Sequence, residues 1–154
     1  MPQIATDTLT ESAARLRLAI TRTARRLRQE AAGELTPTTV AALATVERHG
    51  PLTPSELADL ERVRRPTATR TLRALEEAGL VVRTPDPSDG RSALVDVTAA
   101  GRERLRRLRG RKNAYLARRM RALPADELET LERAAAILER MLDDGRPRGG
   151  GERG

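Results

Sequence analysis

The order of predicted elements in the middle of the chain constrains its fold more than any other feature. A short helical stretch over 55–60 and a tight connection lead into a second helical stretch over 64–79. Residues 80–84 and 93–97 are rich in β-branched residues and flank a Pro/Asp/Gly turn, which predicts a β-hairpin. Helix, turn, helix and hairpin in this order predict a winged helix-turn-helix.

Boundary signals support these two helices. Thr53-Pro54-Ser55-Glu56 is a capping box with proline in the first turn, which marks the start of the first helix. Pro66 cannot lie deep inside a helix and therefore opens the second one. Gly79 stands where a left-handed residue commonly ends a helix.

Four further stretches carry apolar residues at steps of three and four, which is typical of helices. They cover 8–33, 36–49, 98–120 and 124–142. The last is a heptad seam of the kind that packs against another helix, formed by Leu128, Leu131, Ala135, Leu138 and Leu142. Residues 1–7 are expected to be a loose lead-in, and the Gly- and Arg-rich tail over 143–154 is expected to be disordered.

The core must be built almost without aromatic residues, since the chain has no Phe or Trp and one Tyr. Packed helices suit a core of Leu, Ala, Val and Ile better than a β-sandwich does. The expected fold is mainly α with a small β-ribbon (α+β), in which a winged helix-turn-helix lobe joins a helical region from both chain ends. The absence of cysteine excludes disulfides, thiolate zinc sites and thiol redox sensing.

Charge favours a polyanionic partner, because the net charge is +7 and the pI about 11.2. Five arginines and no acid lie between residues 62 and 73, namely Arg62, Arg64, Arg65, Arg70 and Arg73. Thr67, Thr69 and Thr71 lie among them, and their hydroxyls can bond phosphates or base edges. A charge run alone usually marks a solvated face, but the flanking helix and hairpin favour DNA recognition.

The tip of the predicted hairpin is the second basic feature. Arg91 ends a protruding turn and could enter the minor groove, where the potential is most negative. Asp89 either holds that arginine or simply forms the turn. The alternative is an ordinary hairpin loop with a solvated arginine.

Catalytic and cofactor patterns are missing from the sequence. With one histidine and no cysteine, it shows no His/acid cluster, no metal-ligand spacing, no phosphate-cradling glycine loop and no nucleophile with a base. We therefore expect no enzyme, no metal and no cofactor. No apolar run approaches the ~20 residues of a membrane span, and no signal peptide is visible, so no membrane partner and a cytoplasmic, nucleoid-associated location are expected.

From Leu35 to Leu142 the sequence resembles the MarR family of bacterial transcriptional regulators. The resemblance rests on the order and spacing of seven motifs: Leu35-Thr36-Pro37, His49-Gly50-Pro51-Leu52-Thr53, Ser55-Glu56-Leu57-Ala58, Arg65-Pro66-Thr67-Ala68-Thr69-Arg70, Leu75-Glu76-Glu77-Ala78-Gly79-Leu80-Val81, Asp86-Pro87-Ser88-Asp89-Gly90-Arg91 and Thr98-Ala99-Ala100-Gly101. It implies an obligate homodimer that represses transcription from a pseudo-palindromic operator on double-stranded DNA. Its domain would span 8–142, with the helix-turn-helix at 55–79, the wing at 80–97 and dimerisation helices at 8–33 and 98–142.

The resemblance also implies a set of DNA-binding residues. By position these are Ser55, Arg64, Arg65, Thr67, Ala68, Thr69, Arg70, Arg73, Asp89 and Arg91. Many relatives carry glycine where this chain has Arg62 and a polar cap, often serine, where it has Arg64. The turn and the base contacts can therefore differ here, and either arginine can add a phosphate contact.

Relatives often release DNA when a small aromatic or phenolic acid binds between the dimer region and the lobe. For such an effector the sequence offers only His49 and Tyr115, each the sole residue of its type. A lone tyrosine more commonly fills a core, and a lone histidine more commonly ends a helix. The ligand site therefore stays open.

The sequence thus favours a sequence-specific DNA-binding regulator, and the family resemblance implies a repressor. The alternative is a non-specific architectural DNA-binding protein, which shares the charge but needs no discrimination. A helical scaffold that used only the heptad seam would leave the wing unexplained.

Overall fold

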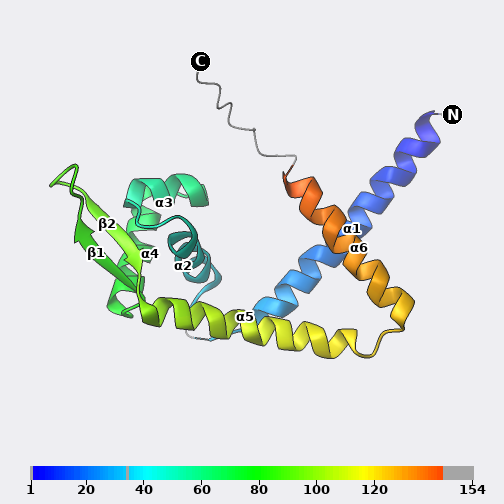
Figure 1. Cartoon of the computed structure of the whole chain (residues 1–154). Helices are drawn as coiled ribbons and strands as arrows, with labels where there is room; N and C mark the ends of the chain where they lie inside the picture. Colours follow the sequence, from blue (N-terminus) through cyan, green and yellow to red (C-terminus); the bar gives the residue numbers. More distant parts are fainter. Residues whose placement is uncertain (1, 34, 144–154) are drawn as a thin grey trace, which may run out of the picture. The chain divides into compact units, whose positions relative to one another are not determined.

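A computed structural model describes residues 2–33 and 35–143, with side chains from residue 6 onward. Its elements follow the order α1 (Pro2–Glu30), α2 (Pro37–His49), α3 (Pro54–Glu61), α4 (Arg65–Glu77), β1 (Val81–Pro85), β2 (Ala93–Val97), α5 (Ala99–Met120) and α6 (Ala125–Asp143) (Figure 1). The chain divides into two compact units, one up to Tyr115 and one from Leu116. This mostly helical chain with one small sheet confirms the expected fold class.

The core of the first unit lies among α2, α3, α4, the two strands and the start of α5. Its most deeply buried side chains are leucines and valines, among them Leu43, Leu72, Leu75, Val46 and Val95, each fully shielded from solvent. All members of this cluster are Ala, Leu or Val. The aromatic-poor composition is thus compatible with a closely packed helical lobe.

Threonine side chains cap the starts of α2, α3 and α5. The Thr36 side chain accepts a hydrogen bond from the Thr39 N–H at 3.2 Å and caps α2. At α3 the capping box is complete, since Thr53 Oγ1 accepts from the Glu56 N–H and the Glu56 carboxylate accepts from the Thr53 N–H at 2.8 Å. Thr98 Oγ1 accepts from the Gly101 N–H in the first turn of α5.

The two strands form the predicted antiparallel hairpin, with Val81 opposite Val97 and Pro85 opposite Ala93. Val95 also exchanges two backbone hydrogen bonds with Leu52, at 2.7 and 3.0 Å. This bridge gives the chain a short extended position at Leu52, after α2. It anchors the base of the hairpin to the lobe.

Helix α1 begins earlier than expected. The sequence predicted a loose lead-in over 1–7, whereas α1 starts at Pro2. Proline is tolerated in the first helical turn, and Gln3, Ile4 and Ala5 are not helix breakers, so the helix can begin at Pro2.

In the second unit, α6 follows Pro124 as predicted, and none of its residues is buried. Leu131, Ile137, Met141 and Leu142 are exposed, at 44 to 77 % of their surface. The predicted disordered tail lies outside the described residues, apart from Asp143, which ends α6. No helix in the described part of the chain is both long and apolar enough to cross a bilayer.

Candidate nucleic-acid interface

Helix α4 has one face in the core and one face in solvent. Ala68, Leu72 and Leu75 are at most 2 % exposed and hold the helix against the lobe. The outer face carries a shallow hollow of about 430 Å³, lined by Arg65, Pro66, Thr69, Arg70 and Arg73. A rigid helix therefore presents three guanidinium groups and one hydroxyl together.

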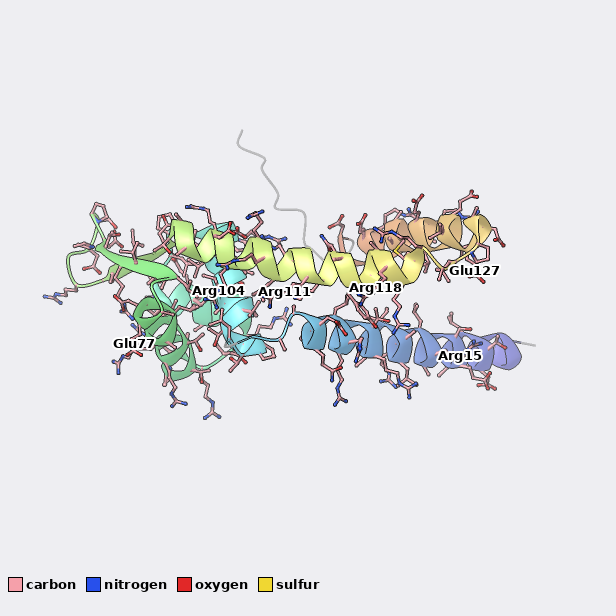
Figure 2. The ribbon with its side chains drawn as sticks, turned by 90° about the horizontal axis from the view of Figure 1, so that it is seen from below. Arg15, Glu77, Arg104, Arg111, Arg118 and Glu127 are labelled. Atoms are coloured by element: carbon pink, nitrogen blue, oxygen red, sulfur yellow. The ribbon has the colours of Figure 1, made fainter. Side chains whose placement is uncertain are left out.

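The positive charge of this face is not neutralised within the described residues. Arginines 62, 64, 65, 70 and 73 form no ion pair there. The acids of α4 are confined to its last turn, where Glu76 pairs with Arg83 at 2.8 Å and Glu77 follows (Figure 2). The beginning and middle of α4 can thus attract an anion without first breaking an internal pair.

The predicted site residues on α4 do not all face outward. Ala68 was wrongly included, because its methyl group is 2 % exposed and belongs to the core. Thr67 is exposed and Thr69 half-buried beside the hollow. Thr71 uses its hydroxyl inside the helix, donating to the Thr67 carbonyl at 3.0 Å.

The residues that precede α4 form its entry turn. Arg64 occupies the N-cap position, and its side chain makes no capping hydrogen bond. The preceding helix ends at Arg62, which has a left-handed backbone with φ of 53°. Ser55 lies half-buried in the first turn of α3. The turn between α3 and α4 thus contains Arg62 and Arg64 in place of the glycine and polar cap of many relatives. It still leads directly into α4.

Two aspartates shape the loop at the hairpin tip. Asp86 accepts hydrogen bonds from the Ser88 hydroxyl at 2.7 Å and from the Ser88 N–H at 2.9 Å. These bonds stabilise the carboxylate and lower the pKa of Asp86. Asp89 accepts from the Arg91 N–H and the Ser92 hydroxyl, so it forms the turn.

The exposed guanidinium of Arg91 makes no ion pair with any described residue. Of the two roles considered for Asp89, the structure shows turn formation through the Arg91 backbone. The tip of the hairpin therefore carries a positive side chain on a loop that its own hydrogen bonds hold in shape.

Helix α5 is also rich in arginine, and acidic side chains pair with some of these residues. Glu103 pairs with Arg106 at 2.8 Å and with Arg107 at 3.6 Å, and the first of these contacts lowers the pKa of Glu103. Arg109 reaches Glu47 of α2 at 2.7 Å. Figure 2 shows Arg104 and Arg111, seven residues apart, along one side of the helix. Arg106, Arg107 and Arg109 thus have acidic partners within the described fold.

A second, larger hollow of about 740 Å³ lies where the end of α1, the start of α2 and the middle of α5 meet. It is lined by Ala24, Arg25, Leu27, Arg28, Gln29, Ala31, Ala32, Gly33, Leu35, Pro37, Val40, Ala41, Ala44, Leu108 and Lys112. Its wall is mostly aliphatic, with three cationic side chains. Sequence reasoning did not find these residues, because they come from three segments whose proximity depends on the fold.

Neither residue considered for an effector site lines this hollow. His49 is exposed at the end of α2. The Tyr115 hydroxyl accepts a hydrogen bond from Arg26 Nε at 3.2 Å, and the Arg26 guanidinium lies 5.5 Å from the ring centroid. In this unit Tyr115 thus joins α5 to α1.

Comparison with known proteins agrees with this geometry. The sequence pattern of the MarR family matches residues 35–93. An uncharacterised HTH-type transcriptional regulator of Mycobacterium leprae is 34 % identical over 130 residues, which cover 84 % of this chain and 91 % of the relative.

Solved structures share the fold. A Pseudomonas aeruginosa protein named as a transcriptional regulator is 36 % identical, with a TM-score of 0.79 over 86 % of this chain and 94 % of its own. A mutant of S. aureus MepR, solved bound to an oligodeoxyribonucleotide, has a TM-score of 0.67 at 20 % identity, over 88 % of this chain and 98 % of its own. From its fold and from these relatives, the chain belongs to the MarR family of DNA-binding transcriptional regulators.

Proposed function

We propose that this chain is a homodimeric, sequence-specific repressor that binds a pseudo-palindromic operator on double-stranded DNA. The observation that carries the proposal is the exposed arginine face of α4, which has no acid partner among the described residues. Its first turns enter the major groove, with Arg65, Thr69 and Arg70 nearest the bases. Ser55, Arg64, Thr67 and Arg73 contact phosphates and set the register.

The hairpin acts as the wing. Arg91 enters the minor groove beside the site that α4 reads, because a narrow minor groove concentrates negative potential. Asp89 supports this role by forming the turn that presents Arg91. The S. aureus relative bound to an oligodeoxyribonucleotide provides the precedent for DNA as the partner of this fold.

Two helices support a homodimer. In the first unit α1 exposes Leu9, Leu16, Leu18 and Ile20, each at more than 40 % of its surface. In the second, α6 exposes the apolar side chains described above. Both helices are amphipathic, and unpartnered leucines at helical spacing favour packing against further helices. Dimerisation places two α4 helices about 34 Å apart, one DNA turn.

The charges of these two helices are complementary. Six arginines and three acids lie on α1, whereas six acids and two arginines lie on α6. Contacts between α1 of one subunit and α6 of its partner would therefore be attractive. This arrangement favours pairing of two copies through both chain ends.

The hollow beside α1, α2 and α5 supports an effector of matching chemistry. Aliphatic walls accept a small ring or chain, and Arg25, Arg28 and Lys112 attract a carboxylate or phenolate. A small aromatic acid bound there would favour one arrangement of α1 and the lobe and so release the operator. Such a repressor works in the cytoplasm, at the nucleoid.

The proposal is tested by footprinting on the DNA upstream of the chain's own gene, with random duplex as competitor. We expect a protected, roughly two-fold symmetric region and a preference over random DNA of about a thousandfold or more. Equal affinity for both duplexes would show a non-specific architectural protein instead.

The effector is tested separately with benzoate and hydroxybenzoates. They are expected to raise the melting temperature and weaken operator binding of the wild type, but to affect an Ala41→Leu variant much less, because leucine fills the hollow. If the wild type responds to none of them, or if the variant responds equally, the hollow is not the effector site.

A further inference from the structure

Helices α3 and α4 end in the same backbone pattern but with different residues. At the end of α4, Gly79 donates to the Glu76 carbonyl and Leu80 to the Leu75 carbonyl, both at 2.9 Å. At the end of α3, Arg62 donates to the Asp59 carbonyl at 3.3 Å and Val63 to the Ala58 carbonyl at 3.0 Å. Each pair is a Schellman motif, which requires a left-handed residue.

Only one of these two ends has the residue that the conformation favours. Gly79 has φ of +72°, as expected for glycine. Arg62 has φ of 53° and ψ of 43°, and among the described residues it is the only non-glycine with a positive φ. A β-carbon destabilises this conformation. The arginine thus carries a conformational cost that glycine would avoid.

The Arg62 side chain offers no visible compensation within the fold. It is exposed and forms no ion pair with any described residue, although Asp59 lies one helical turn before it. Its backbone closes the turn, and the neighbouring Val63 packs against the core. Closing the turn explains why residue 62 has a left-handed backbone, but it does not explain why this residue is an arginine.

The position of Arg62 brings its positive charge close to the proposed DNA-binding face of α4. It lies three residues before α4 begins, in the turn that leads to the basic hollow at Arg65. When the first turns of α4 enter a major groove, this turn lies at the groove edge, beside the sugar–phosphate strand. A long side chain there meets phosphate oxygens, for which a guanidinium provides forked donors.

We propose that Arg62 binds a DNA phosphate. Its left-handed backbone position would be more stable with glycine, so the cationic side chain is kept there at the expense of stability. This inference rests on the proposed DNA-binding function. It adds a contact outside the recognition helix and the wing. Backbone strain at functional sites follows the same logic, in which stability is exchanged for binding.

The test compares three variants of the full chain, Arg62→Gly, Arg62→Ala and Arg62→Lys. Thermal unfolding measures stability, and fluorescence anisotropy with a 30-base-pair random-sequence duplex measures binding over a range of salt concentrations. We expect Arg62→Gly to raise the melting temperature by about 2–4 °C. The same variant should bind the duplex about threefold to tenfold more weakly, with a log–log salt slope shallower by about one per subunit.

The other two variants separate conformation from charge. Arg62→Ala keeps a β-carbon, so it should lose affinity without gaining stability. Arg62→Lys keeps the charge, so it should bind within about twofold of the wild type without gaining stability. Gly79→Ala calibrates the conformational cost and should lower the melting temperature by a similar amount. Arg48→Ala at the end of α2 removes the same charge from an exposed position without an ion pair among the described residues, and should leave the salt slope unchanged.

Opposite changes in stability and affinity for Arg62→Gly support the inference. If this variant binds the duplex with the wild-type affinity and salt slope, Arg62 contacts no phosphate and the inference fails, while the proposed function stands. If the wild type itself does not bind any duplex, the proposed function fails. If Arg48→Ala loses as much affinity as Arg62→Gly, net charge alone explains the effect and the inference is overturned.

Discussion

Arg83 on β1 donates from Nε to Oε2 of Glu76 on α4 at 2.8 Å, and this ion pair joins the first strand of the wing to the last turn of the recognition helix. The connection between them is short, and Leu80 and Val81 bury their side chains in the lobe. The two elements proposed to read adjacent grooves are therefore held by packing, with the ion pair on the outer side.

The Arg83–Glu76 pair should contribute little to stability and little to the salt dependence of binding. About a third or more of each side chain is exposed, so a double-mutant cycle of Arg83→Met and Glu76→Gln should give a coupling below about 1 kcal/mol. Because Glu76 already neutralises Arg83, Arg83→Met should leave the salt slope of DNA binding nearly unchanged. Arg70→Ala should instead make the salt slope shallower if Arg70 contacts phosphate. If Arg70 reads a base, the variant should lose about 1–3 kcal/mol of binding free energy at particular base positions. Anisotropy titrations of both variants make the comparison. A larger loss for Arg83→Met would place Arg83 on the DNA.

Gly101 marks a close approach between α5 and the segment before β1. A β-carbon at this position would lie 2.8 Å from Val97 Cγ2 and even closer to the carbonyl oxygen of Leu80. Gly101→Ala should therefore destabilise the protein by about 1–3 kcal/mol in urea unfolding.

Gly110 provides the matched control on the same helix, because nothing lies within 4 Å of the β-carbon that would be added there. Gly110→Ala should stabilise by about 0.5–1 kcal/mol through helix propensity alone. Equal effects of the two substitutions would contradict the close packing at Gly101.

The hydrogen bonds that Asp86 accepts from Ser88 make a pH prediction for the wing. They lower the pKa of Asp86 below the ordinary 3.8, so its stabilising effect is present above that pH and is lost as the pH falls through the lowered value. A carboxyl ¹³C NMR titration should find the midpoint below 3.8 in the wild type. Ser88→Ala removes the hydroxyl donor, so the midpoint should rise. An unchanged midpoint would show that the hydroxyl does not bind the carboxylate.

Arg91 should contribute to affinity in a way that depends on the flanking sequence. Since narrow A·T-rich minor grooves have the most negative potential, Arg91→Ala should weaken binding more for sites with A·T flanks than for sites with G·C flanks. Binding of both duplexes by wild type and variant measures the difference, and Arg91→Lys tests the guanidinium specifically. A uniform loss across both flanks would mean that Arg91 contacts phosphate only.

Local signals in the sequence predicted most of the fold. The caps at Thr36, Thr53 and Thr98 are contacts between residues three apart, so they can be recognised without the tertiary structure. The hairpin followed from the β-branched residues of its two strands and the Pro/Asp/Gly turn between them. The start of α1 was missed, because the residues before Thr8 show no apolar periodicity although they are compatible with a helix.

Tertiary structure decided the remaining features of the site. Ala68 belongs to the family motif, but the packing of α4 turns its methyl group into the core. The hollow near Leu108 combines three segments distant in sequence. The left-handed backbone of Arg62 results from closing the turn after α3, and no propensity of arginine predicts it.

The central claim is that unpaired arginines on α4 and the wing neutralise DNA phosphates, and the salt dependence of duplex binding by the purified protein tests it most directly. With about 6–10 phosphates contacted per dimer, the log of the association constant should fall against the log of salt concentration with a slope of roughly −5 to −9. A slope near zero, or no binding at low salt, would contradict the account.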